Sequence, residues 1–148
     1  MKPLNTEPAT AAGTRRTEPT TFKYETPQTE KPKTICRLFR TDVMYGTVQV
    51  LKEGGENNLH AHNAQDGFWF VLKGRVRFYG EGDKLLGEFG QHEGIHIPRG
   101  FYYWFEAVGD GGLELLQVEA IDLTQKKNLR LNATERQDPS KQVQIIGG

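Results

Sequence analysis

Two histidines separated by one residue are the strongest chemical signal in the sequence. His60 and His62 flank Ala61 in a segment that reads as a β-strand. Because alternate residues of a strand point to the same face, the two imidazoles are expected side by side, with Ala61 on the opposite face. Imidazole is a ligand for zinc, iron, nickel, copper and manganese. The pair therefore indicates a site for a divalent metal ion or another small ligand.

Two further residues are candidates for proton transfer or for completing a metal site. Asp66 follows the histidine pair after three residues, and its carboxylate is a candidate ligand and a candidate catalytic group. Tyr103 lies in the aromatic run Phe-Tyr-Tyr-Trp-Phe at 101–105. If its side chain points inward, its hydroxyl can bind a metal, donate a hydrogen bond to a substrate or act as a general acid.

Aromatic side chains predict the walls of a small-molecule pocket. We expect Trp69 and Phe105 to line it, because such sites combine apolar and aromatic walls with a few polar groups. His96 lies between Ile95 and Ile97 on a predicted strand, so its side chain either enters the same cavity or faces water. Trp69, Phe105 and His96 are the predicted ligand-binding or cofactor-binding residues.

Short apolar runs separated by glycine-rich turns indicate the scaffold that positions these residues. The predicted strands cover residues 35–39, 43–51, 68–72, 76–79, 85–89, 95–98, 102–108 and 113–121. Short strands at intervals of about ten residues predict an all-β sandwich or barrel. No stretch between residues 34 and 121 sustains a helical period for three turns.

The composition divides the chain into three parts. Residues 1–33 are rich in Thr, Pro, Glu and Lys, which predicts a polar arm that is disordered or extended over a partner. Residues 34–121 hold the barrel, and residues 122–148 form a polar C-terminal extension that has room for a short helix or strand.

The histidine segment resembles the first motif of the cupin family. That motif runs glycine, five residues, His-x-His, three or four residues, glutamate, six residues, glycine; Gly54, 60–62 and Gly74 match it. The second cupin motif contains Pro-x-Gly, two residues and histidine, and 98–100 matches its Pro-x-Gly. The resemblance covers residues 43–121 and implies an antiparallel cupin-type β-barrel, also called a double-stranded β-helix or jelly roll.

Two of the four metal-ligand positions that the resemblance implies carry other residues. Counted back from the closing glycine, the glutamate position is Gly67, and the position of the third histidine is Tyr103. In one interpretation a metal is still bound, through the histidine pair and a displaced ligand: Asp66, Gln65, His96 or Tyr103. In the other, the metal is lost and the barrel binds an organic ligand, because two histidines alone bind a divalent ion weakly.

Two functions therefore remain open. The first is a metal-dependent cupin enzyme of the dioxygenase, isomerase or lyase type, in which His60, His62 and Asp66 hold iron, zinc, manganese or nickel and Tyr103 or Asp66 moves a proton. The alternative is a metal-free ligand-binding or sensor cupin without catalytic activity. Both predict a small-molecule ligand, and the resemblance implies a homodimer.

Composition excludes several other classes of partner. The 19 basic and 19 acidic residues balance, so no field steers nucleic acid toward the chain. No apolar run is long enough for a membrane span, and the N-terminus lacks the apolar stretch of a signal peptide, which predicts a cytoplasmic protein. Cys36 is the single cysteine, so an internal disulfide is impossible.

Overall fold

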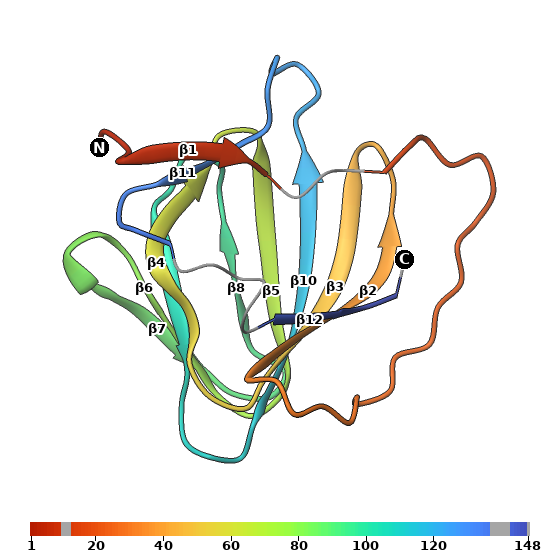
Figure 1. Cartoon of the computed structure of the whole chain (residues 1–148), viewed down its shortest axis with the longest axis vertical. Coiled ribbons are helices and arrows are strands. Elements are labelled where there is room, and N and C mark those ends of the chain that lie inside the picture. The colour runs from red at the N-terminus through yellow and green to blue at the C-terminus, as the bar shows by residue number, and fades with distance from the viewer. Residues whose placement is uncertain (10–12, 137–142, 148) are drawn as a thin grey trace.

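Two facing β-sheets make up the molecule (Figure 1). The computed structural model describes residues 1–9, 13–136 and 143–147. Its strands are β1 (Asn5–Pro8), β2 (Lys33–Arg40), β3 (Met44–Leu51), β4 (Gly55–His62), β5 (Gln65–Lys73), β6 (Val76–Tyr79), β7 (Leu85–Phe89), β8 (Gly94–Ile97), β9 (Tyr103–Ala107), β10 (Leu113–Ile121), β11 (Leu129–Asn132) and β12 (Val143–Ile146). A single 3-10 turn, η1 (Glu81–Asp83), is the helical element of the described residues.

The chain crosses repeatedly between the sheets. One sheet has the order β1-β11-β4-β9-β6-β7 and the other the order β12-β2-β3-β10-β5-β8. Successive strands from β3 to β10 mostly change sheet, which is the winding of a double-stranded β-helix or jelly roll, as the sequence predicts. Within the described residues no strand pairing joins the two sheets, so the predicted barrel is a sandwich and does not close.

Both ends of the chain add strands to this scaffold. β1 pairs with β11 at the edge of one sheet, and β12 pairs in parallel with β2 at the edge of the other. Between β1 and β2 the described chain runs outside the sheets without forming a strand (Figure 1). This segment contacts the sheets of the same chain. Phe22 stacks on Phe39, and the hydroxyls of Tyr24 and Thr26 donate to the carboxylate of Glu114.

The inward-facing residues change from apolar to polar along each central strand. On β10 the inward positions read Leu113, Leu115, Gln117 and Glu119. The apolar half forms the core, which consists of Leu51, Trp69, Val71, Val76, Phe78, Ile97, Tyr103, Phe105, Leu113 and Leu115. Burial of these side chains stabilises the sandwich by about 2 kcal/mol for each large residue. The polar half lines a cavity between the sheets.

No helix in the described part of the chain has the length and apolar character needed to cross a membrane.

Candidate functional site

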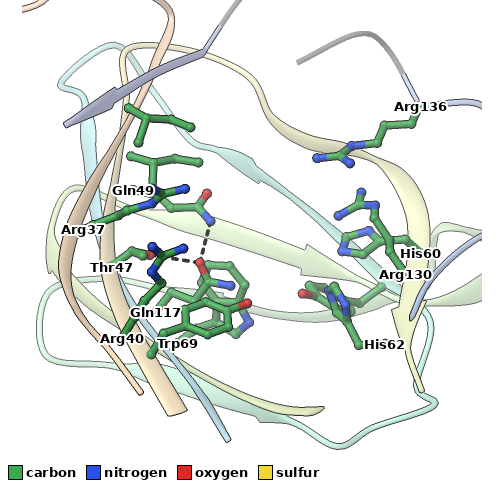
Figure 2. Close-up of a pocket in the computed structure, with 14 residues that line it drawn as sticks. Arg37, Arg40, Thr47, Gln49, His60, His62, Trp69, Gln117, Arg130 and Arg136 are labelled. Atoms are coloured by element: carbon green, nitrogen blue, oxygen red, sulfur yellow. Dashed lines mark hydrogen bonds between the residues drawn. The ribbon is translucent and has the colours of Figure 1, made fainter. Parts of the chain in front are cut away.

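A pocket opens between the sheets at their polar end (Figure 2). Its lining comprises Ile35, Arg37, Arg40, Tyr45, Thr47, Gln49, His60, His62, Trp69, Tyr103, Gln117, Arg130, Arg136 and Ile145. The cavity volume is about 120 Å³, several times what one water molecule needs. The pocket therefore has the size for a small polar molecule.

Both histidines of the strand motif line this pocket. His60 is 1% exposed, and its Nδ1 lies 2.9 Å from the backbone oxygen of Asn58. A carbonyl oxygen only accepts, so Nδ1 donates this bond, and in the neutral ring Nε2 is the atom without a proton. His62 is half-buried, and its ring lies 5.4 Å from that of His60 at an interplanar angle of 87°.

Tyr103 and Trp69 complete the floor of the pocket. Tyr103 on β9 is paired with His60 on β4, and their ring centroids are 4.5 Å apart. Trp69 contacts Tyr103 edge to face, with the ring centroids 6.3 Å apart. Phe105 is fully buried against Trp69 in the apolar core and is not among the lining residues. Of the predicted aromatic residues, Trp69 and Tyr103 thus reach the pocket.

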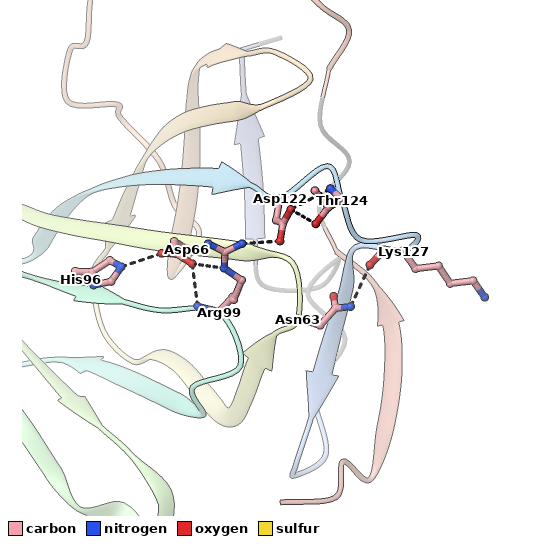
Figure 3. Close-up of polar contacts among 7 residues, drawn as sticks. All are labelled: Asn63, Asp66, His96, Arg99, Asp122, Thr124 and Lys127. Atoms are coloured by element: carbon pink, nitrogen blue, oxygen red, sulfur yellow. Dashed lines mark hydrogen bonds and ion pairs between the residues drawn. The ribbon is translucent and has the colours of Figure 1, made fainter.

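Asp66 and His96 lie on the outer face of their sheet (Figure 3). Asp66 alternates with the inward-facing Gln65 and Gly67, and its side chain is 31% exposed, while that of His96 is 61% exposed. Asp66 accepts hydrogen bonds from His96 Nε2 at 3.2 Å and from Arg99 Nε at 2.9 Å. Partial burial raises the pKa of Asp66, but these bonds and that from the Arg99 backbone outweigh it and hold the pKa below its ordinary value.

The predicted set of His60, His62 and Asp66 is therefore not brought together, because Asp66 has the wrong strand parity. Among the described residues, no three His, Cys, Asp or Glu side chains come close enough to hold a metal ion. Catalytic metal sites in proteins have three protein ligands as a rule. The described His, Cys, Asp and Glu side chains do not fit such a site.

A carboxylate that sequence reasoning missed occupies the space beside Gly67. Glu119 on β10 is the strand partner of Gly67 on β5. A Cβ atom at position 67 would lie 3.0 Å from Glu119 Oε1 and 3.3 Å from Trp69 Nε1. Glu119 therefore fills the volume that a side chain at 67 would require, next to His62 and Tyr103 in a small side cavity.

Burial governs the chemistry of Glu119. Its side chain is 1% exposed, and this burial raises the pKa of its carboxyl to about 7, although the hydrogen bond from Gln117 opposes the shift. Oε1 accepts a bond of 2.8 Å from Gln117 Nε2, and Oε2 has no hydrogen-bond partner in the described part of the chain. A carboxyl with a pKa near neutrality can both hold and release a proton.

A chain of hydrogen bonds connects Glu119 with the pocket wall. Thr47 Oγ1 and Gln49 Nε2 both donate to Gln117 Oε1, at 3.1 Å and 2.8 Å. Gln117 in turn donates to Glu119 at 2.8 Å, so the wall formed by β3 and β10 is a polar network. Figure 2 shows the part of it that Thr47, Gln49 and Gln117 form. The signal in the sequence was the glutamine and glutamate at alternate positions of an otherwise apolar strand, at 117 and 119.

Four arginines line the pocket, and sequence reasoning identified none of them as site residues. Arg37 and Arg40 come from β2, Arg130 from β11 and Arg136 from the segment that follows it. Arg37 and Arg40 would face opposite ways on a regular strand, but a bulge between residues 37 and 39 changes the parity. The sequence did not predict this cluster, because the two pairs of arginines are far apart in the chain and β2 is irregular.

The fold is that of the cupins. No protein-family model matches the sequence, and no curated protein matches it. Among solved structures, a conserved protein with a double-stranded β-helix domain from Klebsiella pneumoniae has a TM-score of 0.59 at 14% identity, covering 76% of this chain and 92% of that one. An RmlC-like cupin protein from Desulfovibrio desulfuricans has a TM-score of 0.56 at 18% identity, with 71% and 97% covered.

A ligand-bound structure has a similar fold. A variant of Streptomyces PAC13, solved with uridine, has a TM-score of 0.50 at 11% identity and covers 67% of this chain and 74% of its own. At these identities the likeness concerns the fold alone, and one fold hosts many functions.

Proposed function

We propose that this chain, which has the cupin fold, binds a small polar molecule in the pocket between its two sheets without needing a metal ion. The observation that carries the proposal is the lining itself: a buried network of polar side chains faces a cavity beside aromatic walls. Burying so many polar groups is costly unless they are paired or serve a ligand. PAC13, with a similar fold, has been solved with the small molecule uridine.

The groups that would contact the ligand are His60, His62 and Tyr103 on one side and Gln49 and Gln117 on the other. Each offers a hydrogen-bond donor or acceptor, and Trp69 closes the floor with an apolar ring. Glu119 lines a small side cavity together with His62 and Tyr103, so its carboxyl is the candidate group for acid–base chemistry. The arrangement thus provides recognition together with a group for acid–base chemistry.

A metal-dependent enzyme, the function that the strand motif predicts, is the second candidate. The bond from His60 Nδ1 to Asn58 favours it, because metal-binding histidines commonly donate their other ring N–H to a carbonyl oxygen. Such an enzyme requires a third ligand, and the described His, Cys, Asp and Glu side chains provide none. The metal-free function is for this reason the one proposed.

Binding by the metal-stripped protein tests the proposal. After EDTA treatment and elemental analysis, a panel of neutral, cationic and anionic polar small molecules is screened by thermal unfolding and calorimetry. We expect binding that His62→Ala weakens about tenfold, the equivalent of one lost hydrogen bond. His96→Ala is the matched control, because it removes the same side chain from the outer face. Binding that appears only after metal is restored would establish the second candidate instead.

We also propose a homodimer, which the family resemblance implies. The side chain of Phe68 supports it, because this large apolar residue is 46% exposed on the outer face of β5 and stacks on Phe70. Sedimentation velocity at micromolar concentration tests the assembly, and a monomer there would exclude it.

A further inference from the structure

We infer that the ligand of this pocket is a hydroxylated organic anion, carrying a carboxylate or a phosphate group that the arginines bind. The inference rests on the proposed function and names the chemical class of its ligand. It is drawn from three features of the pocket: its charge, the way in which its arginines are held and its hydrogen-bonding groups without partners.

The charge of the lining contrasts with that of the whole chain. The protein has no net charge, yet the described lining residues include four arginines and no aspartate or glutamate. Figure 2 shows Arg37 and Arg40 on one side of the pocket and Arg130 and Arg136 on the other, the side on which His60 and His62 also lie. A cavity lined by one sign of charge concentrates ligands of the opposite sign.

The arginines are held in a way that suits anion binding. Arg130 is buried, and its Nε and Nη2 donate to Asn132 Oδ1 at 2.9 Å and to Asn58 Oδ1 at 2.6 Å. These two bonds to amide oxygens orient the guanidinium. A fixed guanidinium fork matches the two oxygens of a carboxylate or phosphate.

The neighbouring arginines differ in how much charge they offer. Arg136 forms an ion pair with Glu7 of β1, which offsets part of its charge. The half-buried Arg37 has no hydrogen bond or ion pair of its side chain within the described ranges of the chain. A ligand anion would therefore give Arg37 its first ion pair, and Arg37 is the residue to substitute.

Two unpaired groups indicate hydroxyls on the ligand. Gln49 Oε1 is a buried acceptor, and Trp69 Nε1 is a buried donor; neither has a hydrogen-bond partner among the described residues. Both residues line the pocket. A hydroxyl group can donate to the first and accept from the second, which an aliphatic group cannot. The pocket is thus matched to a molecule with an anionic group and one or more hydroxyls.

Calorimetry with three related probes tests this inference on the full-length, metal-stripped protein. The probes are glucose, glucuronate and glucose 6-phosphate, which share the pyranose ring and its hydroxyl groups and differ in the group at C6. We expect one or both anions to bind at least about tenfold more tightly than glucose, because charge-assisted hydrogen bonds are the strong ones. Preference between glucuronate and glucose 6-phosphate then distinguishes a carboxylate ligand from a phosphate ligand.

Substitutions of Arg37 test whether the anion binds in the pocket. Arg37→Gln is expected to weaken anion binding about tenfold and Arg37→Lys less, because lysine keeps the charge but not the fork. Arg75→Gln is the matched control: it removes the same charge from an exposed ion pair with Glu88, outside the pocket. Raised salt should weaken anion binding by the wild-type protein.

Three results would overturn the inference: equal affinity for glucose and the anions, anion binding that Arg37→Gln leaves unchanged, or no binding of either anion. These results remain separable from failure of the proposed function. If neutral molecules of the screen bind and His62→Ala weakens them, the pocket is a binding site for uncharged ligands. If no molecule of any charge binds, both proposals fall.

Discussion

At the scale of single residues, the site differs from the motif in where its carboxylate comes from. The sequence motif predicts a carboxylate at position 67 or at the neighbouring Asp66. The buried carboxylate beside the histidines instead belongs to Glu119 on the paired strand. The parity of one strand predicts which of its own residues face inward. It does not predict which residue of the partner strand fills the space left by a glycine, because that depends on the register between strands distant in sequence.

Glu119 should make the stability of the protein depend on pH. Its pKa is about 7 in the folded protein against 4.5 in a model compound, so the folded state retains a proton that the unfolded state releases between these values. The contribution of the protonated form to stability is fully present below about pH 4.5 and is lost as pH rises through about 7. Ionising this buried group costs roughly 3 kcal/mol at higher pH.

The variant Glu119→Gln removes this titration. Urea unfolding of the two proteins at about pH 5 and about pH 8 should show the variant gaining up to roughly 3 kcal/mol relative to the wild type at the higher pH. Glu88→Gln, at an exposed carboxyl, controls for the loss of one charge. A difference between Glu119→Gln and the wild type that is the same at both pH values would contradict the assigned titration.

At the scale of elements, the sequence predicts strands well where they are regular. The runs at 76–79, 85–89 and 113–121 coincide with β6, β7 and β10. Composition is weaker evidence near the chain ends: β1, β11 and β12 are strands of only four residues in segments that are polar overall, and pairing with neighbouring strands forms them. The bulge in β2 was likewise unpredictable, and it brings Arg40 into the pocket.

The buried side chain of Asn132 connects β11 with β4 and β1. Asn132 on β11 accepts hydrogen bonds from Asn58 Nδ2 and Arg130 Nε, and its own Nδ2 donates to Asn5 and Glu7 on β1. Asn132→Ala would leave buried donors of Asn58 and Arg130 without this acceptor, and we expect a loss of about 2–4 kcal/mol in the free energy of unfolding.

Denaturant unfolding measures this loss. The matched control is Asn5→Ala, which removes an exposed partner of Asn132 and should cost less than about 1 kcal/mol. Equal effects of the two substitutions would show that Asn132 does not hold the three strands together. Because Asn132 also orients Arg130, the variant should bind anions more weakly at temperatures at which it remains folded.

At the scale of the whole molecule, charge and polarity are distributed unevenly. A neutral chain places its apolar inward residues at one end of the sandwich and its polar residues, with four arginines, at the other. The fold class followed from the spacing of short strands and the motif resemblance. The pocket did not, because its residues come from eight strands and the segment after β11, and their proximity arises only when the two sheets face each other.

The two tryptophans provide the most direct test that this pocket binds a small molecule without metal. Trp69 lies in the pocket wall, whereas Trp104 is outside it and donates to Asp83 at 3.0 Å. The indole N–H signals of ¹⁵N-labelled, metal-stripped protein are recorded with each molecule of the panel, and Trp104→Phe assigns them. We predict a ligand that shifts the Trp69 signal in a saturable manner and leaves that of Trp104 in place. If no molecule moves the Trp69 signal, or every one that does requires added metal, the pocket is not a metal-free binding site.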